Sequence, residues 1–65
     1  MPGGYVHLDV LEIEAETEKA FLLRLEDREV WVPFSQIADA DDYERGDTDC
    51  TVSVTQWFAD KEGLG

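Results

Sequence analysis

The stretch YVHLDVLEIEAE, residues Tyr5 to Glu16, decides the fold because its apolar and polar side chains alternate. In its first half the apolar set is Val6, Leu8 and Val10. In its second half the apolar set is Leu11, Ile13 and Ala15. A period of two is typical of a half-buried β-strand, and the one-residue slip after Val10 is typical of a β-bulge. Helix formers are frequent here too, but the alternation is cleaner than any helical stripe, so the sequence predicts one long strand.

Two shorter alternating segments follow this strand. In KAFLLRLE, residues 19–26, the inward set is Phe21, Leu23 and Leu25. In the next segment the inward set is Val30, Val32 and Phe34, which leaves Trp31 and Pro33 on the other face. The polar run EDRE between them is a short turn, so the two segments are predicted to form a β-hairpin.

A fourth strand and a helix are predicted at the C-terminal end. CTVSVT, residues 50–55, is rich in β-branched residues and places Cys50, Val52 and Val54 inward. The period then changes in TQWFADKEGL, where the Thr55 hydroxyl can cap a helix that ends at Gly63. We expect the inward residues of this helix to be Trp57 and Leu64.

These elements predict a mainly β fold, a small four-stranded SH3-like or OB-like barrel with a short C-terminal helix. A flat sheet would leave apolar residues on both faces of the second and third strands, and coiling the sheet into a barrel hides more of them. The 65 residues form one domain, with residues 1–4 expected to fray. A single core of this size supplies a net stability of only roughly 3–5 kcal/mol.

The segment WVPFSQI, residues 31–37, contains a proline, which sheets tolerate at edges, strand ends and bulges. A strand that ends in Pro-x-Ser-x-Ile resembles the Pro-Ser-Asn-Tyr-Val ending of SH3 domains. The Ala-Leu-Tyr-Asp-Tyr signature and the paired tryptophans of the SH3 groove are missing. The resemblance therefore implies an SH3-like strand ending and no proline-rich ligand.

A longer resemblance spans roughly residues 18 to 64. EKAFLLRLEDREVWVPFSQI, then an acidic loop and VTQWFADKEGL, resembles short uncharacterised proteins of bacteria and their phages. Those proteins pair a Trp-Ile-Pro-Lys-Ser-Gln-Ile-like segment with a Trp-(Ile/Leu/Phe)-Ala-x-x-Lys-Gly-Leu-like end. Here Phe34 replaces the usual lysine, and Glu62 lies between Lys61 and Gly63. The resemblance implies a shared small fold and a phage or mobile-element origin, and it implies no activity.

The net charge of the chain limits the classes of partner that it can bind. Sixteen acidic residues against five basic ones give a formal net charge of −11. Such a field repels phosphate backbones, so no direct nucleic-acid binding is expected, whereas basic protein surfaces are attracted. Solubility and adaptation to a salty cytoplasm are alternative causes of the acidity.

The sequence favours a cytoplasmic protein without a membrane span. It has a lone cysteine, no signal-peptide pattern and no apolar run of ~18 residues.

Catalysis and metal binding are not expected from these residues. Cys50 is predicted to point inward, and His7, its only possible imidazole partner, lies on another strand. An EF-hand that begins at Asp41 would place Gly46 correctly, but Val52 would stand where a bidentate glutamate belongs. No cofactor motif is found. The sequence therefore predicts a non-enzymatic protein without a cofactor. It predicts a solvated acidic loop, with a weak adventitious Ca²⁺ or Mg²⁺ site in that loop as the alternative.

Two features remain as candidates for binding. Trp31 and Phe34 are aromatic anchors of the kind that dominate interface hot spots, unless Trp57 and Leu64 pack over Trp31. The acidic loop can steer a basic partner through its acidic side chains and one tyrosine, namely Asp39, Asp41, Asp42, Tyr43, Glu44, Asp47 and Asp49. These residues predict an acidic binding module, in its sharper form a phage-type inhibitor that mimics nucleic-acid charge toward a nuclease or other DNA-handling protein. The alternatives are an OB-like nucleic-acid accessory protein and a homodimeric assembly module that buries Trp31.

Overall fold

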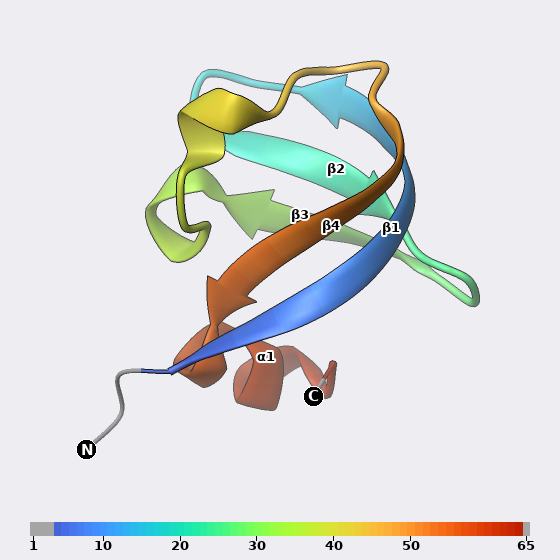
Figure 1. Cartoon of the computed structure of the whole chain (residues 1–65). Coiled ribbons are helices and arrows are strands. Elements are labelled where there is room, and N and C mark those ends of the chain that lie inside the picture. The colour runs from blue at the N-terminus through green and yellow to red at the C-terminus, as the bar shows by residue number, and fades with distance from the viewer. Residues whose placement is uncertain (1–3, 65) are drawn as a thin grey trace.

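The computed structural model describes residues 4–64 and consists of one antiparallel sheet, one α-helix and two short 3₁₀ helices (Figure 1). The strands are β1 (Tyr5–Glu16), β2 (Ala20–Arg24), β3 (Glu29–Pro33) and β4 (Thr48–Thr55). The helices are η1 (Phe34–Gln36), η2 (Ala40–Asp42) and α1 (Gln56–Glu62). The mainly β fold with a short C-terminal helix is confirmed. Of the four residues expected to fray, residues 1–3 lie outside the described part of the chain, and the Gly4 carbonyl accepts a hydrogen bond from the Gln56 N–H (3.0 Å).

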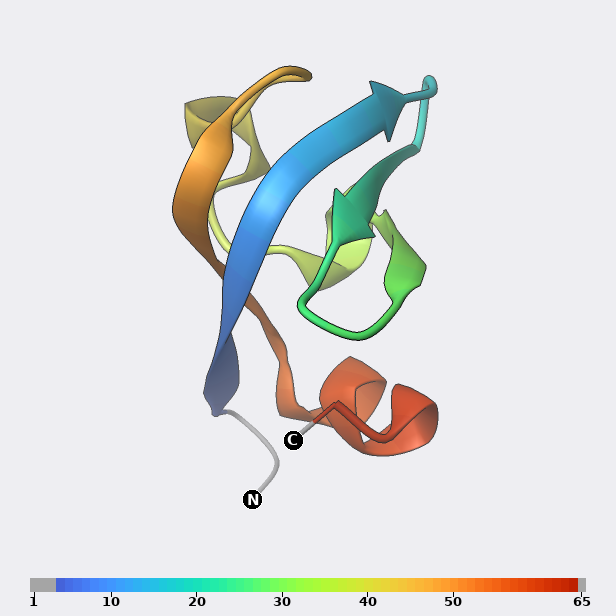
Figure 2. The ribbon, with the colours of Figure 1, turned by 90° about the vertical axis from the view of Figure 1, so that its right-hand side faces the viewer.

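The sheet has the order β3-β2-β1-β4 and is not closed into a barrel. It coils strongly, and Figure 2 shows β1 bending along its whole length. The chain beyond β3 crosses to the far edge of the sheet, where Ile37 forms an isolated bridge with Val54 and the Ala38 N–H donates to the Ser53 carbonyl (2.9 Å). This segment, rather than β3 itself, therefore reaches β4.

The inward set of β1 changes phase along the strand, as its sequence predicts. Val10 is buried opposite Cys50 of β4, and Ile13 is buried opposite Leu23 of β2. Three details of the prediction are wrong. Leu11 points outward and is 45% exposed, and Ala15 lies on the outer face, where it is paired with Leu22. The irregularity in the β1–β2 register lies between Ile13 and Ala15 rather than after Val10.

The hairpin of β2 and β3 is confirmed, with Leu23 paired to Val30 and Leu22 to Trp31. Its turn is closed by a hydrogen bond from the Leu25 N–H to the Arg28 carbonyl (2.7 Å). The buried core, drawn from all four strands, the Ile37 bridge and α1, is Leu8, Val10, Ile13, Phe21, Leu23, Val30, Val32, Ile37, Val52, Val54, Phe58 and Ala59. Each strand contributes alternate residues to this core, which is why a period of two identifies them.

Helix α1 begins and ends as its sequence predicts, but it buries a different face. The Thr55 hydroxyl accepts a hydrogen bond from the Phe58 N–H (3.2 Å), and Gly63 ends the helix in a left-handed conformation (φ 71°). Phe58 and Ala59 are the buried residues of α1, whereas Trp57 is 58% exposed. The expectation that Trp57 points inward is therefore wrong, because the direction in which β4 enters this two-turn helix selects the buried face.

The Thr55 hydroxyl also donates a hydrogen bond to the Gln36 side-chain carbonyl, so one group connects η1 to α1. We expect Thr55→Ala to lower the free energy of unfolding by about 1–2 kcal/mol, because both the helix cap and this connection are lost. Urea denaturation followed by circular dichroism measures the change. Thr55→Ser retains the hydroxyl and is the matched control, and an equal loss in both variants would contradict this role.

Candidate functional site

The acidic loop folds as an ordered segment, here called the acidic ridge (residues 39–49). Asp39, in the left-handed conformation (φ 56°), precedes η2, and Gly46 (φ 99°) allows a tight turn before β4. The ridge is joined to the middle of β1 by two backbone hydrogen bonds, from the Gly46 N–H to the Ile13 carbonyl and from the Ile13 N–H to the Asp47 carbonyl, both 2.8 Å. Its carboxylates are therefore held on a fixed backbone.

The ridge concentrates negative charge. Six carboxylates and the Arg45 guanidinium give it a net charge of −5. The carboxylates belong to Asp39, Asp41, Asp42, Glu44, Asp47 and Asp49. All are exposed except Asp47, which is half-buried and accepts a hydrogen bond from the Glu44 N–H (3.0 Å). Asp47 therefore shapes the turn, and the other five face solvent.

Two of the expected aromatic residues lie beside the ridge. Phe34, at the start of η1, is half-buried and meets the Phe21 ring edge to face, with centroids 4.8 Å apart. Tyr43, within the ridge, donates from its hydroxyl to the Thr51 carbonyl of β4 (2.9 Å). Burial is the main cause that raises the pKa of Tyr43 above its usual value, so the hydroxyl is neutral at neutral pH. Both rings are therefore held by the core and by β4.

A pocket of about 180 Å³ brings some of these residues together. Its lining consists of Glu16, Phe21, Phe34, Ala40, Asp41 and Tyr43. Three of the six were expected binding residues, namely Phe34, Asp41 and Tyr43. Glu16 was missed because it belongs to the end of β1, and only its pairing with Phe21 places it here.

Trp31 lies on a different part of the surface and does not line this pocket. It points outward from edge strand β3, is 49% exposed and is paired across the sheet with Leu22, which in turn is paired with Ala15. Trp57 is exposed and carries the Lys61 ammonium group 5.1 Å from its ring centroid. Trp31 therefore keeps half of its surface open to solvent.

Two carboxyl groups meet on the outer face of the sheet. The neighbouring Glu14 carboxyl, through a shared hydrogen bond and then through charge repulsion, raises the pKa of Glu29 above its ordinary value of 4.5. Arg24 opposes this shift and forms an ion pair with Glu14 (3.3 Å). The folded chain therefore binds a proton at Glu29 more readily than the unfolded chain does. Protonation of Glu29 thus stabilises the fold at low pH, and this stabilisation is lost as the pH rises through the pKa that Glu29 has in the folded chain.

We expect Glu29→Gln to raise the urea midpoint at about pH 7, because it removes the repulsion from Glu14. The gain should vanish below about pH 4, where Glu29 is protonated in the parent chain as well. Glu18→Gln, in the exposed turn after β1, removes the same charge and controls for the general relief of repulsion. A midpoint gain no larger than that of the control would show that the Glu14 contact is unimportant.

Cys50 and His7 lie on opposite faces of the sheet. Cys50 is half-buried on the inner face, where burial and the nearby Asp47 raise the pKa of its thiol. His7 points outward and its Nδ1 lies 2.7 Å from the Ser53 hydroxyl, its cross-strand neighbour. The exposed His7–Ser53 pair is a cross-strand hydrogen bond, which is an ordinary source of sheet stability.

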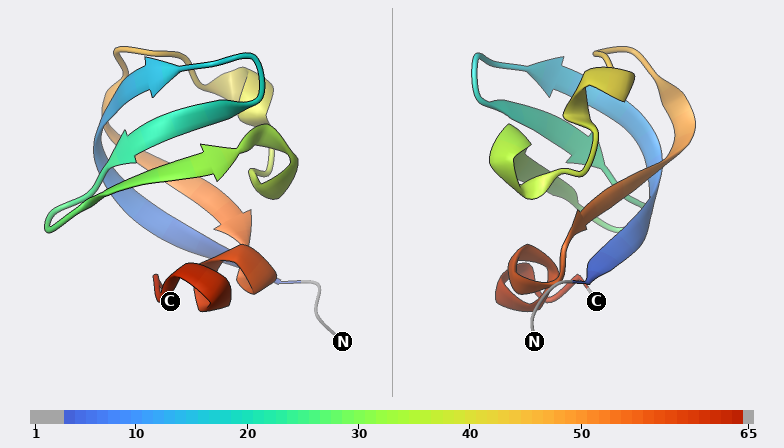
Figure 3. Two further views of the ribbon diagram at one scale, coloured as in Figure 1. Left: turned by 180° about the vertical axis from the view of Figure 1, so that it is seen from behind. Right: turned by 60° about the vertical axis from the view of Figure 1, so that its left-hand side comes forward.

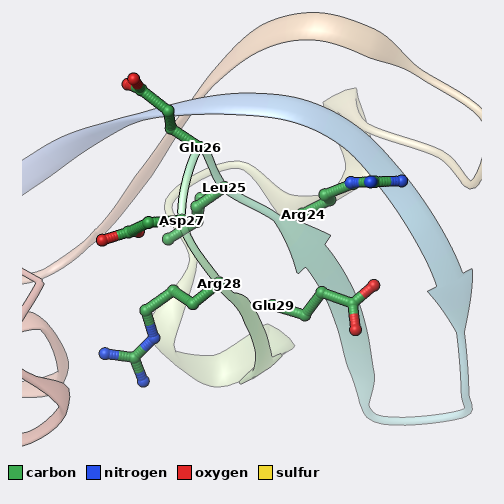
Figure 4. Close-up of a pocket in the computed structure, with 6 residues that line it drawn as sticks. All are labelled: Arg24, Leu25, Glu26, Asp27, Arg28 and Glu29. Atoms are coloured by element: carbon green, nitrogen blue, oxygen red, sulfur yellow. The ribbon is translucent and has the colours of Figure 1, made fainter.

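A second hollow, of about 380 Å³, lies in the β2–β3 turn and is lined by residues 24–29. Figure 4 shows that its charged side chains spread away from one another rather than toward a common point. Among residues 4–64, no three His, Cys, Asp or Glu side chains are grouped so that they could hold a metal ion. No helix in this same range is long and apolar enough to cross a membrane.

Comparison of the chain with protein-family models, with curated proteins and with solved structures gives no significant match. The resemblance to short phage proteins stays a prediction. The surface of the chain carries a strongly charged segment, the acidic ridge, beside a pocket.

Proposed function

We propose that this chain is a non-enzymatic binding module that docks its acidic ridge on a basic protein surface. In its sharper form it is an inhibitor of phage type that presents carboxylates in place of nucleic-acid phosphates to a nuclease or other DNA-handling protein. The observation that carries the proposal is the net charge of −5 on eleven consecutive residues, held on a hydrogen-bonded backbone.

The chemistry of recognition follows from carboxylates that face solvent. Carboxylates and phosphates both accept charge-assisted hydrogen bonds from arginine and lysine, so a fixed row of carboxylates can occupy a site built for a phosphate backbone. The formal net charge of −11 already includes all five basic residues, so the long-range field is strongly negative and would speed encounter with a basic partner.

The finer assignment of the fold, an SH3-like or OB-like barrel, is part of the same proposal. It is supported by the coiling of β1 and by the Ile37–Val54 bridge, which joins the chain that follows β3 to β4. A phage or mobile-element origin is supported by the resemblance of residues 18–64. A cytoplasmic location is supported by the single free thiol of Cys50.

A displacement assay tests the proposed function. Proteins from the organism that makes this chain are loaded on immobilised duplex DNA in about 0.15 M salt, and the purified chain is then added. We expect it to release a defined subset of basic proteins at this salt, and binding of those proteins to the immobilised chain to disappear near 1 M salt, where the Debye length is ~3 Å. Failure to release any protein at the lower salt, retention of those proteins on the immobilised chain at 1 M salt, or binding of the chain to DNA itself would each contradict the proposal.

A homodimer is the second candidate, and the surface around Trp31 favours it. Trp31, Leu22 and Ala15 form a row in register across the outer face of the sheet, next to the open edge of β3. An edge strand with an exposed aromatic residue is a natural template for pairing with a second copy. Sedimentation at several concentrations distinguishes the candidates, because the homodimer dissociates on dilution whereas an inhibitor of the proposed kind is a monomer throughout.

A further inference from the structure

The pocket beside the acidic ridge lies between elements that are distant in the sequence. It is bounded by the end of β1, the start of β2, η1 and η2, and Figure 3 shows both 3₁₀ helices on the same side of the coiled sheet. The β2–β3 turn lies at the opposite end in the left view of that figure. The pocket and the turn can therefore be altered independently.

The lining of the pocket combines aromatic rings with carboxylates. Phe34 and Tyr43, both half-buried, supply the ring surface, with the buried Phe21 ring behind Phe34, and the exposed residues Glu16 and Asp41 supply the charge. Aromatic rings attract cations through their quadrupole, and carboxylates attract them through their charge. An anion would meet repulsion from both carboxylates, and a wholly apolar ligand would leave them unused.

The volume of the pocket limits the size of the ligand that it can hold. Sites for small molecules and cofactors measure roughly 300–1,000 Å³, whereas this pocket measures about 180 Å³. The space suits one flexible chain of a few carbon atoms with a charged end. Lysine and arginine have this form, with an aliphatic stem that packs on apolar surface and a cationic head that seeks carboxylates.

We infer that this pocket receives the side chain of one lysine or arginine from the basic partner, with its stem against Phe34 and Tyr43 and its head between Glu16 and Asp41. The inference rests on the proposed function, because it names the contact that converts general attraction to the ridge into docking in one position. Charge along the ridge brings the partner close, and the pocket fixes its register.

The test is an NMR titration of the ¹⁵N-labelled chain with n-butylguanidinium and n-butylammonium, which stand for the two side chains, and with n-butanol as the neutral probe. We expect either cation to shift the amide signals of the residues that line the pocket, and n-butanol to bind at least about tenfold more weakly. The cation that binds more tightly identifies the residue type. Equal binding of n-butanol would overturn the inference.

Two charge-matched variants separate a pocket from diffuse attraction. Glu16→Gln with Asp41→Asn should weaken binding of the cation about tenfold, whereas Glu26→Gln with Asp27→Asn, in the exposed β2–β3 turn, should change it less than about twofold. Equal weakening in both variants, or shifts spread evenly over all acidic residues, would overturn the pocket. Either result would leave release of basic proteins from DNA intact, so failure of this inference is distinguishable from failure of the proposed function.

Discussion

Replacing Leu23 with alanine is expected to leave most of the chain unfolded at room temperature. Leu23 of β2 is fully buried, between Ile13 of β1 and Val30 of β3. Truncation of a buried leucine costs about 2–5 kcal/mol, which is comparable to the roughly 3–5 kcal/mol that one core of this size supplies. Circular dichroism and amide signal dispersion measure the folded fraction.

Leu11→Ala is the matched control, because it is the same substitution in the same sheet. The Leu11 side chain points outward and is 45% exposed, so we expect its loss to cost less than about 1 kcal/mol. A folded and cooperative Leu23→Ala chain, or an equal loss of stability in Leu11→Ala, would contradict the placement of the core.

Neutralising the acidic ridge is expected to have the largest effect on binding. Asparagine at Asp39, Asp41, Asp42 and Asp49 changes the net charge from −11 to −7. Asp39 and Asp49 have positive φ values (56° and 50°), a conformation that asparagine tolerates, so the backbone of the ridge is retained. We expect the association rate with a basic protein that the chain releases from DNA to fall by about tenfold to a hundredfold at low salt. Stopped-flow fluorescence measures this rate.

A control with the same net charge separates the ridge from the whole-molecule field. It carries Asp9→Asn, Glu18→Gln, Glu26→Gln and Asp27→Asn, all at exposed positions outside the ridge. We expect it to slow association by less than about threefold. If both variants slow association equally, the ridge has no special role, and net charge alone accounts for the attraction.

Alternation of apolar residues was sufficient to predict the strands and the hairpin. Phe21, Leu23, Val30 and Val32 are buried on one face because a strand places alternate side chains on opposite sides, which is a local property of the backbone. The caps of α1 were predictable for the same reason, since Thr55 and Gly63 act on backbone groups within four residues of themselves.

Features that depend on tertiary contacts were not predictable in this way. Leu11 and Ile13 are both apolar and two residues apart, yet Ile13 is buried opposite Leu23 of β2 whereas Leu11 is exposed, which the alternation alone does not predict. Trp57 and Phe58 are equally good inward residues by sequence, and the docking of α1 on the sheet selects Phe58. Whether the sheet closes depends on the path of the chain after β3.

The candidate site could be predicted from the sequence only in part. The charge of the ridge was predictable because its carboxylates lie close together in the sequence. The pocket was not, because Glu16 and Phe21 join Phe34, Asp41 and Tyr43 only through the β1–β2 register and the course of residues 34–43. Trp31 lies on the outer face of β3, as the alternation predicts, and does not line the pocket.

The most direct test of the ridge as a docking surface is amide hydrogen exchange of the whole chain, free and bound to a basic protein that it releases from DNA. We expect slower exchange in the bound state across residues 39–49 and η1, with little change in the β2–β3 turn. Slower exchange confined to the β2–β3 turn or to β3 around Trp31, with the ridge unchanged, would contradict docking through the acidic ridge.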